Sequence, residues 1–148
     1  MILFNTAVSF HILIKKMQLI YIADDSADQR YLFGYFLKRV NPEYPVVFFD
    51  RAKKLLDSLQ SSIQTGGVLP MVVFLDLQMP EVNGFKALEI IMSLNERGGS
   101  WPEIPVVIYS GDSDPDMIRK CLDAGALAFL QKPVDLEKLK NLLLLVQP

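Results

Sequence analysis

The stretch MVVFLDLQMPEVNG, residues 71–84, decides the fold of this chain. Met71 to Leu75 form a short, continuous apolar run that stops at Asp76. Runs of this length without polar alternation are typical of parallel strands whose two faces are both covered by helices. We therefore expect Asp76 to stand at the carboxyl end of a buried central strand.

Four similar apolar runs flank this one, and stretches with helical spacing separate them. The predicted strands cover residues 18–23, 45–50, 71–76, 104–110 and 127–131, and the predicted helices 26–40, 51–62, 84–96, 114–124 and 135–146. The first helix opens with a capping box, Ser26 to Gln29. Its apolar positions, expected to face the sheet, are Leu32, Phe33, Phe36, Leu37 and Val40. Five strand–helix repeats predict the α/β class, a three-layer (βα)5 sandwich around a five-stranded parallel sheet.

Polar side chains follow the predicted strands at the point where each one ends. They are Asp24 and Asp25 after the first strand, Asp76, Ser110, and Lys132 before Pro133. The carboxyl ends of parallel strands share one edge of the sheet, so these groups are expected to meet there. Three carboxylates in one small volume repel each other unless a cation lies among them. The pattern therefore predicts bound Mg²⁺.

This set of side chains fits phosphoryl transfer to an aspartate. Asp76 is the candidate acceptor, and Asp24 and Asp25 can supply metal ligands that neutralise the developing charge. Lys132 and Ser110 can contact phosphate oxygens through an ammonium group and a hydroxyl. Taken singly, each residue has an ordinary structural explanation as a helix cap, a turn residue or a surface lysine. Their coincidence at four strand ends favours the functional interpretation.

The same residues resemble a known family, the receiver domain of bacterial two-component response regulators. The matching motifs are Asp24-Asp25, Asp76 with Met79-Pro80 and Asn83-Gly84, Ser110-Gly111, and the run from Ala126 to Lys132-Pro133. The resemblance covers residues 17–147. It implies a flavodoxin-like fold with strand order 2-1-3-4-5 and a phosphoryl group donated by a sensor histidine kinase or a histidine phosphotransfer protein. It also implies Mg²⁺ held by Asp24, Asp25, Asp76 and the backbone carbonyl of Gln78, and a cis bond at Lys132–Pro133.

The resemblance also implies a switch. Ser110 takes the position of the switch hydroxyl, Phe129 that of the switch aromatic, and Lys132 that of the phosphate-sensing lysine. Phosphorylation is then expected to reshape the surface of the fourth helix, fifth strand and fifth helix. Near the chain's end, Leu144 and Leu145 fall off the apolar stripe of the last helix and are predicted to be exposed, which is compatible with a homodimer through this surface.

Two other functions use similar residues. A Mg²⁺-dependent aspartyl-phosphate phosphatase requires a general acid two positions after its nucleophile, where this chain has Gln78. A flavin or nucleotide binder requires a phosphate-cradling loop after the first strand, where Asp24 and Asp25 instead repel phosphate. A third alternative is a receiver that docks to partners without phosphorylation. We expect a phosphoacceptor rather than an enzyme, signalling as a single-domain regulator to an unknown protein target.

Composition limits the setting. The chain has 148 residues and a net charge of −2, so nothing in its charge suggests nucleic-acid binding. One cysteine, Cys121, excludes an internal disulfide and suits a cytoplasmic location. Residues 1–16 form an apolar extension too short to span a membrane, interpreted either as a start placed upstream of the true Met17 or as a segment that packs on the domain or on another subunit. Residues 17–148 are the predicted receiver domain.

Overall fold

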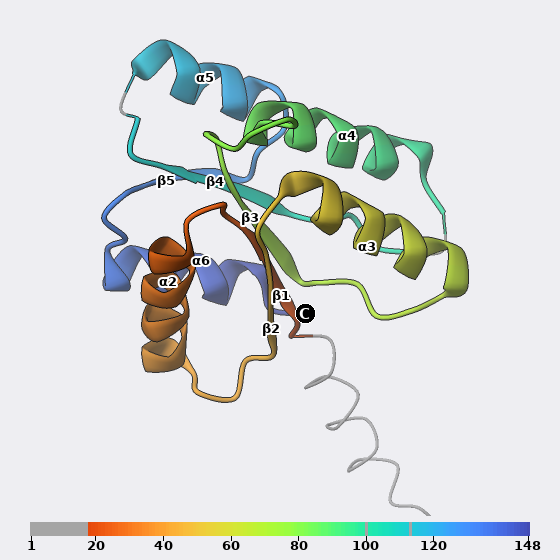
Figure 1. Ribbon diagram of the computed structural model, residues 1–148. Helices are drawn as coiled ribbons and strands as arrows, with labels where there is room; N and C mark the ends of the chain where they lie inside the picture. The colour runs from red at the N-terminus through yellow and green to blue at the C-terminus, as the bar shows by residue number, and fades with distance from the viewer. Residues whose placement is uncertain (1–17, 100, 113) are drawn as a thin grey trace, which may run out of the picture.

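Five parallel strands form one sheet in the order β2-β1-β3-β4-β5 (Figure 1). The computed structural model describes residues 18–99, 101–112 and 114–148. The strands are β1 (Ile20–Ala23), β2 (Val46–Phe49), β3 (Val72–Asp76), β4 (Val106–Ser110) and β5 (Ala128–Gln131). The predicted fold class and strand order are thus confirmed, and the extension 1–16 lies outside the described residues.

Two layers of helices enclose the sheet. The helices are α2 (Ala27–Val40), α3 (Ala52–Thr65), α4 (Gly84–Arg97), α5 (Pro115–Asp123) and α6 (Leu136–Val146). Figure 1 shows α3, α4 and α5 above the sheet and α2 and α6 below it. Within the described residues, no helix is long and apolar enough to cross a membrane.

The strands bury side chains on both faces because each face meets a helical layer. Val73 and Leu75 of β3 pack with leucines of α3 and α4, whereas Val72 and Phe74 pack with Phe33 of α2 and with leucines of α6. All of β1, β3 and β4 is buried, while the edge strand β2 is partly exposed. The three buried strands therefore position the polar residues at their carboxyl ends.

One prediction about the helix faces is wrong. Leu32 was expected to face the sheet, but its side chain is 40% exposed, whereas Phe33 and Leu37 are buried. Phe36 and Val40 are partly buried and pack against the same cluster as Phe33 and Leu37, so the stripe differs from the prediction only at Leu32. In α6, Leu144 and Leu145 are exposed as predicted.

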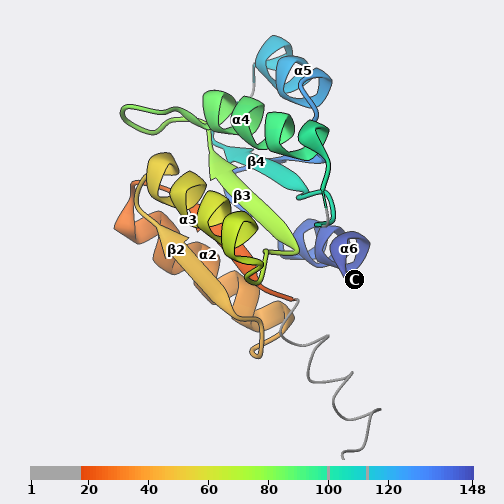
Figure 2. The same cartoon turned by 90° about the vertical axis from the view of Figure 1, so that its right-hand side faces the viewer.

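At the amino end of the sheet, a side chain satisfies the backbone of a loop. The Asn95 amide donates to the carbonyl of Ile104 at 3.1 Å and accepts from the backbone N–H of Ile104 at 2.9 Å. This pair ties Asn95 of α4 to Ile104, two residues before β4. A groove of about 500 Å³ lies beside it, lined by Trp101, Met71 and the C-terminal Pro148 among others. Figure 2 shows the C-terminus near these amino ends of the strands.

Candidate functional site

Three carboxylates meet at the carboxyl end of the sheet. Asp24 follows β1, Asp25 comes next, and Asp76 is the last residue of β3. One oxygen of each lies within 4.8 Å of the others. β1 and β3 are hydrogen-bonded neighbours, with Ala23 opposite Leu75, so the sheet register alone brings these residues together.

The two adjacent aspartates differ in their surroundings. Asp24 is completely buried, whereas Asp25 is exposed. Asp24 Oδ1 accepts the backbone N–H of Ser26 at 2.8 Å, which places the first turn of α2 against the site. The Ser26 hydroxyl in turn accepts the N–H of Gln29 at 3.3 Å, which is one half of the predicted capping box; the Ser26 N–H donates to Asp24 and not to the Gln29 side chain. Asp24 is therefore held in place by the protein, and Asp25 is open to a ligand.

Lys132 bridges two of the carboxylates. Its Nζ lies 3.2 Å from Asp24 Oδ2 and 3.4 Å from Asp76 Oδ2. The lysine follows β5, and its backbone N–H donates to the carbonyl of Ser110 at 2.8 Å. The peptide bond to Pro133 is cis, as the family resemblance implied. One ammonium group thus faces the carboxylates of two strands.

Burial raises the pKa of Asp76. The carboxylate is 6% exposed, so loss of solvation is the largest effect. The charge of Lys132 acts against this effect, and the charge of Asp24 adds to it. The Gln78 N–H also donates to Asp76 Oδ1, at 3.3 Å. Asp76 is thus a carboxylate that gains from a nearby cation, which is what a metal-dependent acceptor needs.

A glycine allows α4 to start against the acceptor strand. A Cβ at Gly84 would lie 2.2 Å from the carbonyl oxygen of Asp76, and the Gly84 N–H donates to the carbonyl of Leu77 at 3.0 Å. Asn83 caps the helix by accepting the N–H of Lys86 at 2.9 Å. The Asn83-Gly84 motif therefore holds the loop after Asp76 in a fixed path.

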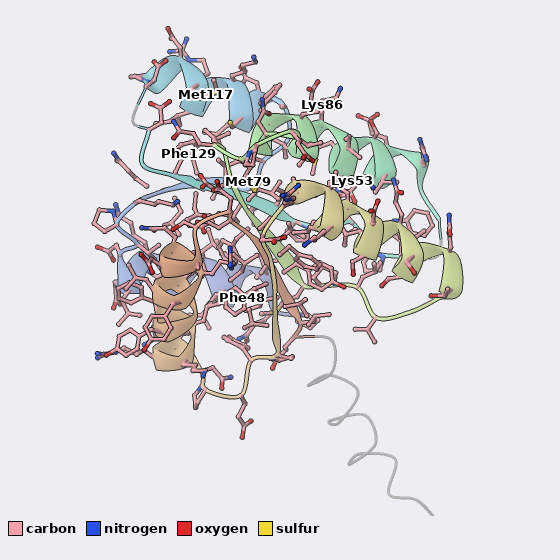
Figure 3. The ribbon with its side chains drawn as sticks, in the orientation of Figure 1. Phe48, Lys53, Met79, Lys86, Met117 and Phe129 are labelled. Atoms are coloured by element: carbon pink, nitrogen blue, oxygen red, sulfur yellow. The ribbon has the colours of Figure 1, made fainter. Side chains whose placement is uncertain are left out.

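The predicted switch residues lie on one face of the sheet. Ser110 is buried, and its Oγ accepts the N–H of Asp112 at 3.1 Å. Phe129 is half-buried and stands beside Ile108 of β4, two residues before Ser110, packed against the cluster under α3 and α4. Figure 3 shows Phe129 on this side of the sheet, near Met117 of α5. The side chain of Gln78 is exposed.

One contact of the site was missed in the sequence. The Tyr109 hydroxyl donates to Asp24 Oδ2, and the Tyr109 side chain is 1% exposed. Burial and the nearby Asp24 carboxylate raise the pKa of Tyr109 far above its ordinary value, so the phenol stays protonated and remains a donor. A tyrosine within a predicted buried strand was the available signal. Its hydroxyl needs a hydrogen-bond partner when buried, and the acidic residues at the same edge of the sheet could supply one.

The three-carboxylate donor set suits Mg²⁺. All its ligand atoms are hard oxygens, and two of the three carboxylates are buried among like charges. The sequence model of a protein family, the response regulator receiver domain, matches residues 20–144.

The chain belongs to the response regulator receiver family. Receiver domains are phosphoacceptors that take phosphoryl groups from histidine kinases or phosphotransfer proteins, and they bind Mg²⁺ at an acidic pocket. In this chain, Asp24, Asp25 and Asp76 form an acidic cluster.

Relatives of this receiver occur in different settings. It is 30% identical over 122 residues to hybrid signal transduction histidine kinase A of Dictyostelium discoideum, covering 82% of the chain and 5% of the kinase. It is 32% identical over 123 residues to the two-component response regulator ORR3 of rice (Oryza sativa subsp. indica), covering 80% of the chain and 84% of that protein. The chain spans between 5% and 16% of the length of the first curated relatives that it matches.

Solved receivers share the fold. A chain of the CheX-CheY-BeF3-Mg²⁺ complex from Borrelia burgdorferi superimposes with a TM-score of 0.71 at 19% identity, covering 86% of this receiver and 87% of that chain. At this identity the likeness concerns the fold alone.

Proposed function

We propose that Asp76 accepts a phosphoryl group from a phosphohistidine of a sensor histidine kinase or a histidine phosphotransfer protein. The observation that carries this proposal is the meeting of three carboxylates with one bridging ammonium, Lys132, at the end of the central strand. The P–N bond of the phosphohistidine breaks as a P–O bond forms at an Asp76 carboxylate oxygen, and hydrolysis later restores the carboxylate.

The neighbouring residues have separate roles in this reaction. Asp24, Asp25, Asp76 and the backbone carbonyl of Gln78 would hold Mg²⁺, which when bound neutralises charge on the carboxylates and on the phosphoryl oxygens. Lys132 contacts a phosphoryl oxygen as a point charge. These roles are carried over by family motif and supported by the positions of the side chains.

The signal leaves the site through Ser110 and Phe129. The Ser110 hydroxyl donates to a phosphoryl oxygen, and Phe129, on the same face of the sheet, turns inward into the space this opens. The surface of α5, β5 and α6 changes shape and binds a downstream protein. Leu144 and Leu145 of α6 are 59% and 77% exposed, and we propose that they support a homodimer. The net charge of −2 supports a protein target rather than nucleic acid.

Acetyl phosphate with Mg²⁺ tests the acceptor directly. Intact mass should rise by one phosphoryl group in the wild type, and the gain should be absent in Asp76→Asn and in a sample without metal. Asp123→Asn, an exposed carboxylate outside the cluster, is the matched control and should be phosphorylated normally. Beryllofluoride binding would detect an acceptor whose phosphoryl group is too short-lived for mass analysis.

The opposite result would select another function. A folded protein that binds neither Mg²⁺ nor beryllofluoride would be a docking receiver that works without phosphorylation. Turnover of an external phosphomonoester would instead indicate a phosphatase, which the exposed amide at Gln78 does not favour.

A further inference from the structure

Tyr109 is a buried residue of the site to which the proposed function gives no role. It is the penultimate residue of β4, next to Ser110. Its ring packs on Phe33 of α2, with centroids 4.9 Å apart, and its hydroxyl donates to Asp24 Oδ2. The ring therefore belongs to the core and the hydroxyl to the acidic site.

Asp24 is completely buried, so the carboxylate oxygen that does not ligate the proposed Mg²⁺ depends on donors from the protein. Oδ1 accepts the N–H of Ser26, and Oδ2 accepts both the Tyr109 hydroxyl and the Lys132 ammonium. The residue is 0% exposed, so water cannot replace a donor that is lost. A buried carboxylate oxygen without a partner is strongly unfavourable.

Lys132 is the donor that phosphorylation would remove. Its Nζ is 3.2 Å from Asp24 Oδ2 and 3.4 Å from Asp76 Oδ2, and it lies 4.5 Å from the centroid of the Tyr109 ring. A phosphoryl group on Asp76 adds negative charge and strong acceptor oxygens, which attract the ammonium away from Asp24. Of the two donors to Asp24 Oδ2, only the Tyr109 hydroxyl then remains.

We propose that the Tyr109 hydroxyl is a positioning group for phosphorylation: it keeps Asp24 Oδ2 hydrogen-bonded and thereby frees Lys132 to bind the phosphoryl group on Asp76. This inference rests on the proposed function above. Without the hydroxyl, Lys132 is the last side-chain donor to Asp24 Oδ2, and moving it toward Asp76 leaves a buried carboxylate oxygen unpaired.

Tyr109→Phe isolates the hydroxyl, because the ring that packs on Phe33 and lies under Lys132 is kept. The chain also offers a matched control. Tyr21 is 5% exposed on β1, and its hydroxyl pairs with Ser58 Oγ of α3 at 3.0 Å. Tyr21→Phe therefore removes a tyrosine hydroxyl of the same kind from a partner outside the acidic site.

Isothermal titration calorimetry on the full chain should separate two ligands. Beryllofluoride, added at saturating Mg²⁺, mimics the phosphoryl group and should bind Tyr109→Phe about tenfold more weakly than wild type, as expected for a lost hydrogen bond to a charged group. Mg²⁺ alone should bind at least as tightly as to wild type, because the Tyr109 hydroxyl is a donor to Asp24 and not a metal ligand. Tyr21→Phe should match wild type for both ligands.

A second measurement needs no variant. In wild-type protein labelled with ¹³C at tyrosine Cζ and with ¹⁵N at lysine Nζ, beryllofluoride should shift the Lys132 signal and leave the Tyr109 Cζ signal that of a neutral, hydrogen-bonded phenol. A Lys132 signal that does not respond while beryllofluoride binds would overturn the inference, even if Tyr109→Phe failed to fold.

The remaining outcomes are also decisive. A wild type that binds neither ligand overturns the proposed function and this inference with it. A wild type that binds both, beside a Tyr109→Phe variant with unchanged beryllofluoride affinity, overturns the inference alone. Equal weakening of Mg²⁺ and beryllofluoride in Tyr109→Phe would also overturn it, because the hydroxyl would then shape the metal ligands instead of freeing Lys132.

Discussion

The two ends of the sheet differ in the kind of side chain that they bury. In the described part of the chain, the three buried polar or charged residues are Asp24, Asp76 and Ser110, and all three stand at the carboxyl ends of strands. At the amino end, Met71 and Ile104 are buried apolar residues. The carboxyl end keeps like charges out of water, which is unfavourable for folding, and the amino end supplies ordinary packing. The buried charges of the site therefore lie at one end of the acceptor strand, and apolar side chains pack around the other end.

The largest effect is expected where packing at the carboxyl end leaves no space. Gly84→Ala places a Cβ 2.2 Å from the Asp76 carbonyl oxygen, so backbone must move. We expect a loss of about 3 kcal/mol in the free energy of unfolding, together with weaker beryllofluoride binding. Urea denaturation measures the first and calorimetry the second. Gly111→Ala, which meets nothing within 4 Å, is the control. A Gly84→Ala protein as stable as that control would contradict the prediction, because the backbone after Asp76 could then move without loss of stability.

At the amino end, Asn95→Ala should separate stability from function. Two hydrogen bonds to the backbone of Ile104 are lost, and the Ile104 side chain is 1% exposed. We expect the free energy of unfolding to fall by about 2 kcal/mol, with no change in phosphorylation by acetyl phosphate below the unfolding transition. Glu96→Ala, an exposed neighbour on α4, should change neither quantity. Reduced phosphorylation of folded Asn95→Ala would show that the two ends are coupled.

Asp76→Asn should have the opposite signature, with function lost and stability gained. The pKa of Asp76 is raised in the folded protein from a reference value of 3.8, so the folded state binds the proton more tightly than the unfolded state. The wild type is therefore relatively stabilised below the unfolded pKa and loses that stability as pH rises through the folded pKa. At pH 7, above the unfolded pKa, the variant should therefore be more stable than the wild type.

Denaturation at two pH values and with metal checks this sign. The stability curves of wild type and Asp76→Asn should converge below about pH 4, where both states of the wild type carry the proton. Mg²⁺ should narrow the gap at pH 7, because it binds the folded wild type. A gap that stays equal at pH 4 and pH 7 would mean that the charge of Asp76 is not its cause.

The smallest effect on folding is expected at Gln78. Its side chain is exposed, two positions after the acceptor, where it can influence the approach of water to a phosphoryl group. Gln78→Ala should change the rate of dephosphorylation several-fold and leave stability within about 0.5 kcal/mol. Loss of phosphate after removal of the donor, followed by mass analysis, gives the rate. An unchanged rate would show that the Gln78 side chain does not influence dephosphorylation.

Much of the fold could be predicted because its three inner strands, β1, β3 and β4, are fully covered. The run from Val72 to Leu75 is apolar on both faces, and such runs are read from sequence without ambiguity once they recur with helices between them. Helix faces are harder. Leu32 looks like part of the buried stripe of α2 but is 40% exposed, because its position depends on how far the helical layer extends across the sheet.

The candidate site could be predicted as a set of residues but not as a set of contacts. The sequence places Asp24 and Asp25 side by side, yet only the structure shows that the first is buried and the second exposed. The contact of Tyr109 with the site was not predicted, because this residue lies within an apolar strand, where its ring behaves as a core side chain. The direction of its hydroxyl is set by the pairing of β3 with β4, which opposes Tyr109 to Asp76.

The complete burial of β3 between two paired neighbours has a consequence for partially opened forms of the molecule. Backbone amides exchange with solvent through local openings whose free energy rises toward that of global unfolding in the most buried elements. β3 is hydrogen-bonded to β1 on one side and to β4 on the other, whereas β2 and β5 are the two edges. Hydrogen exchange should therefore open the edges first and β3 last. The acceptor carboxylate and its neighbours on β1 and β4 then stay together in forms that have already lost the outer strands, so the acidic pocket is among the last parts of the native structure to disappear.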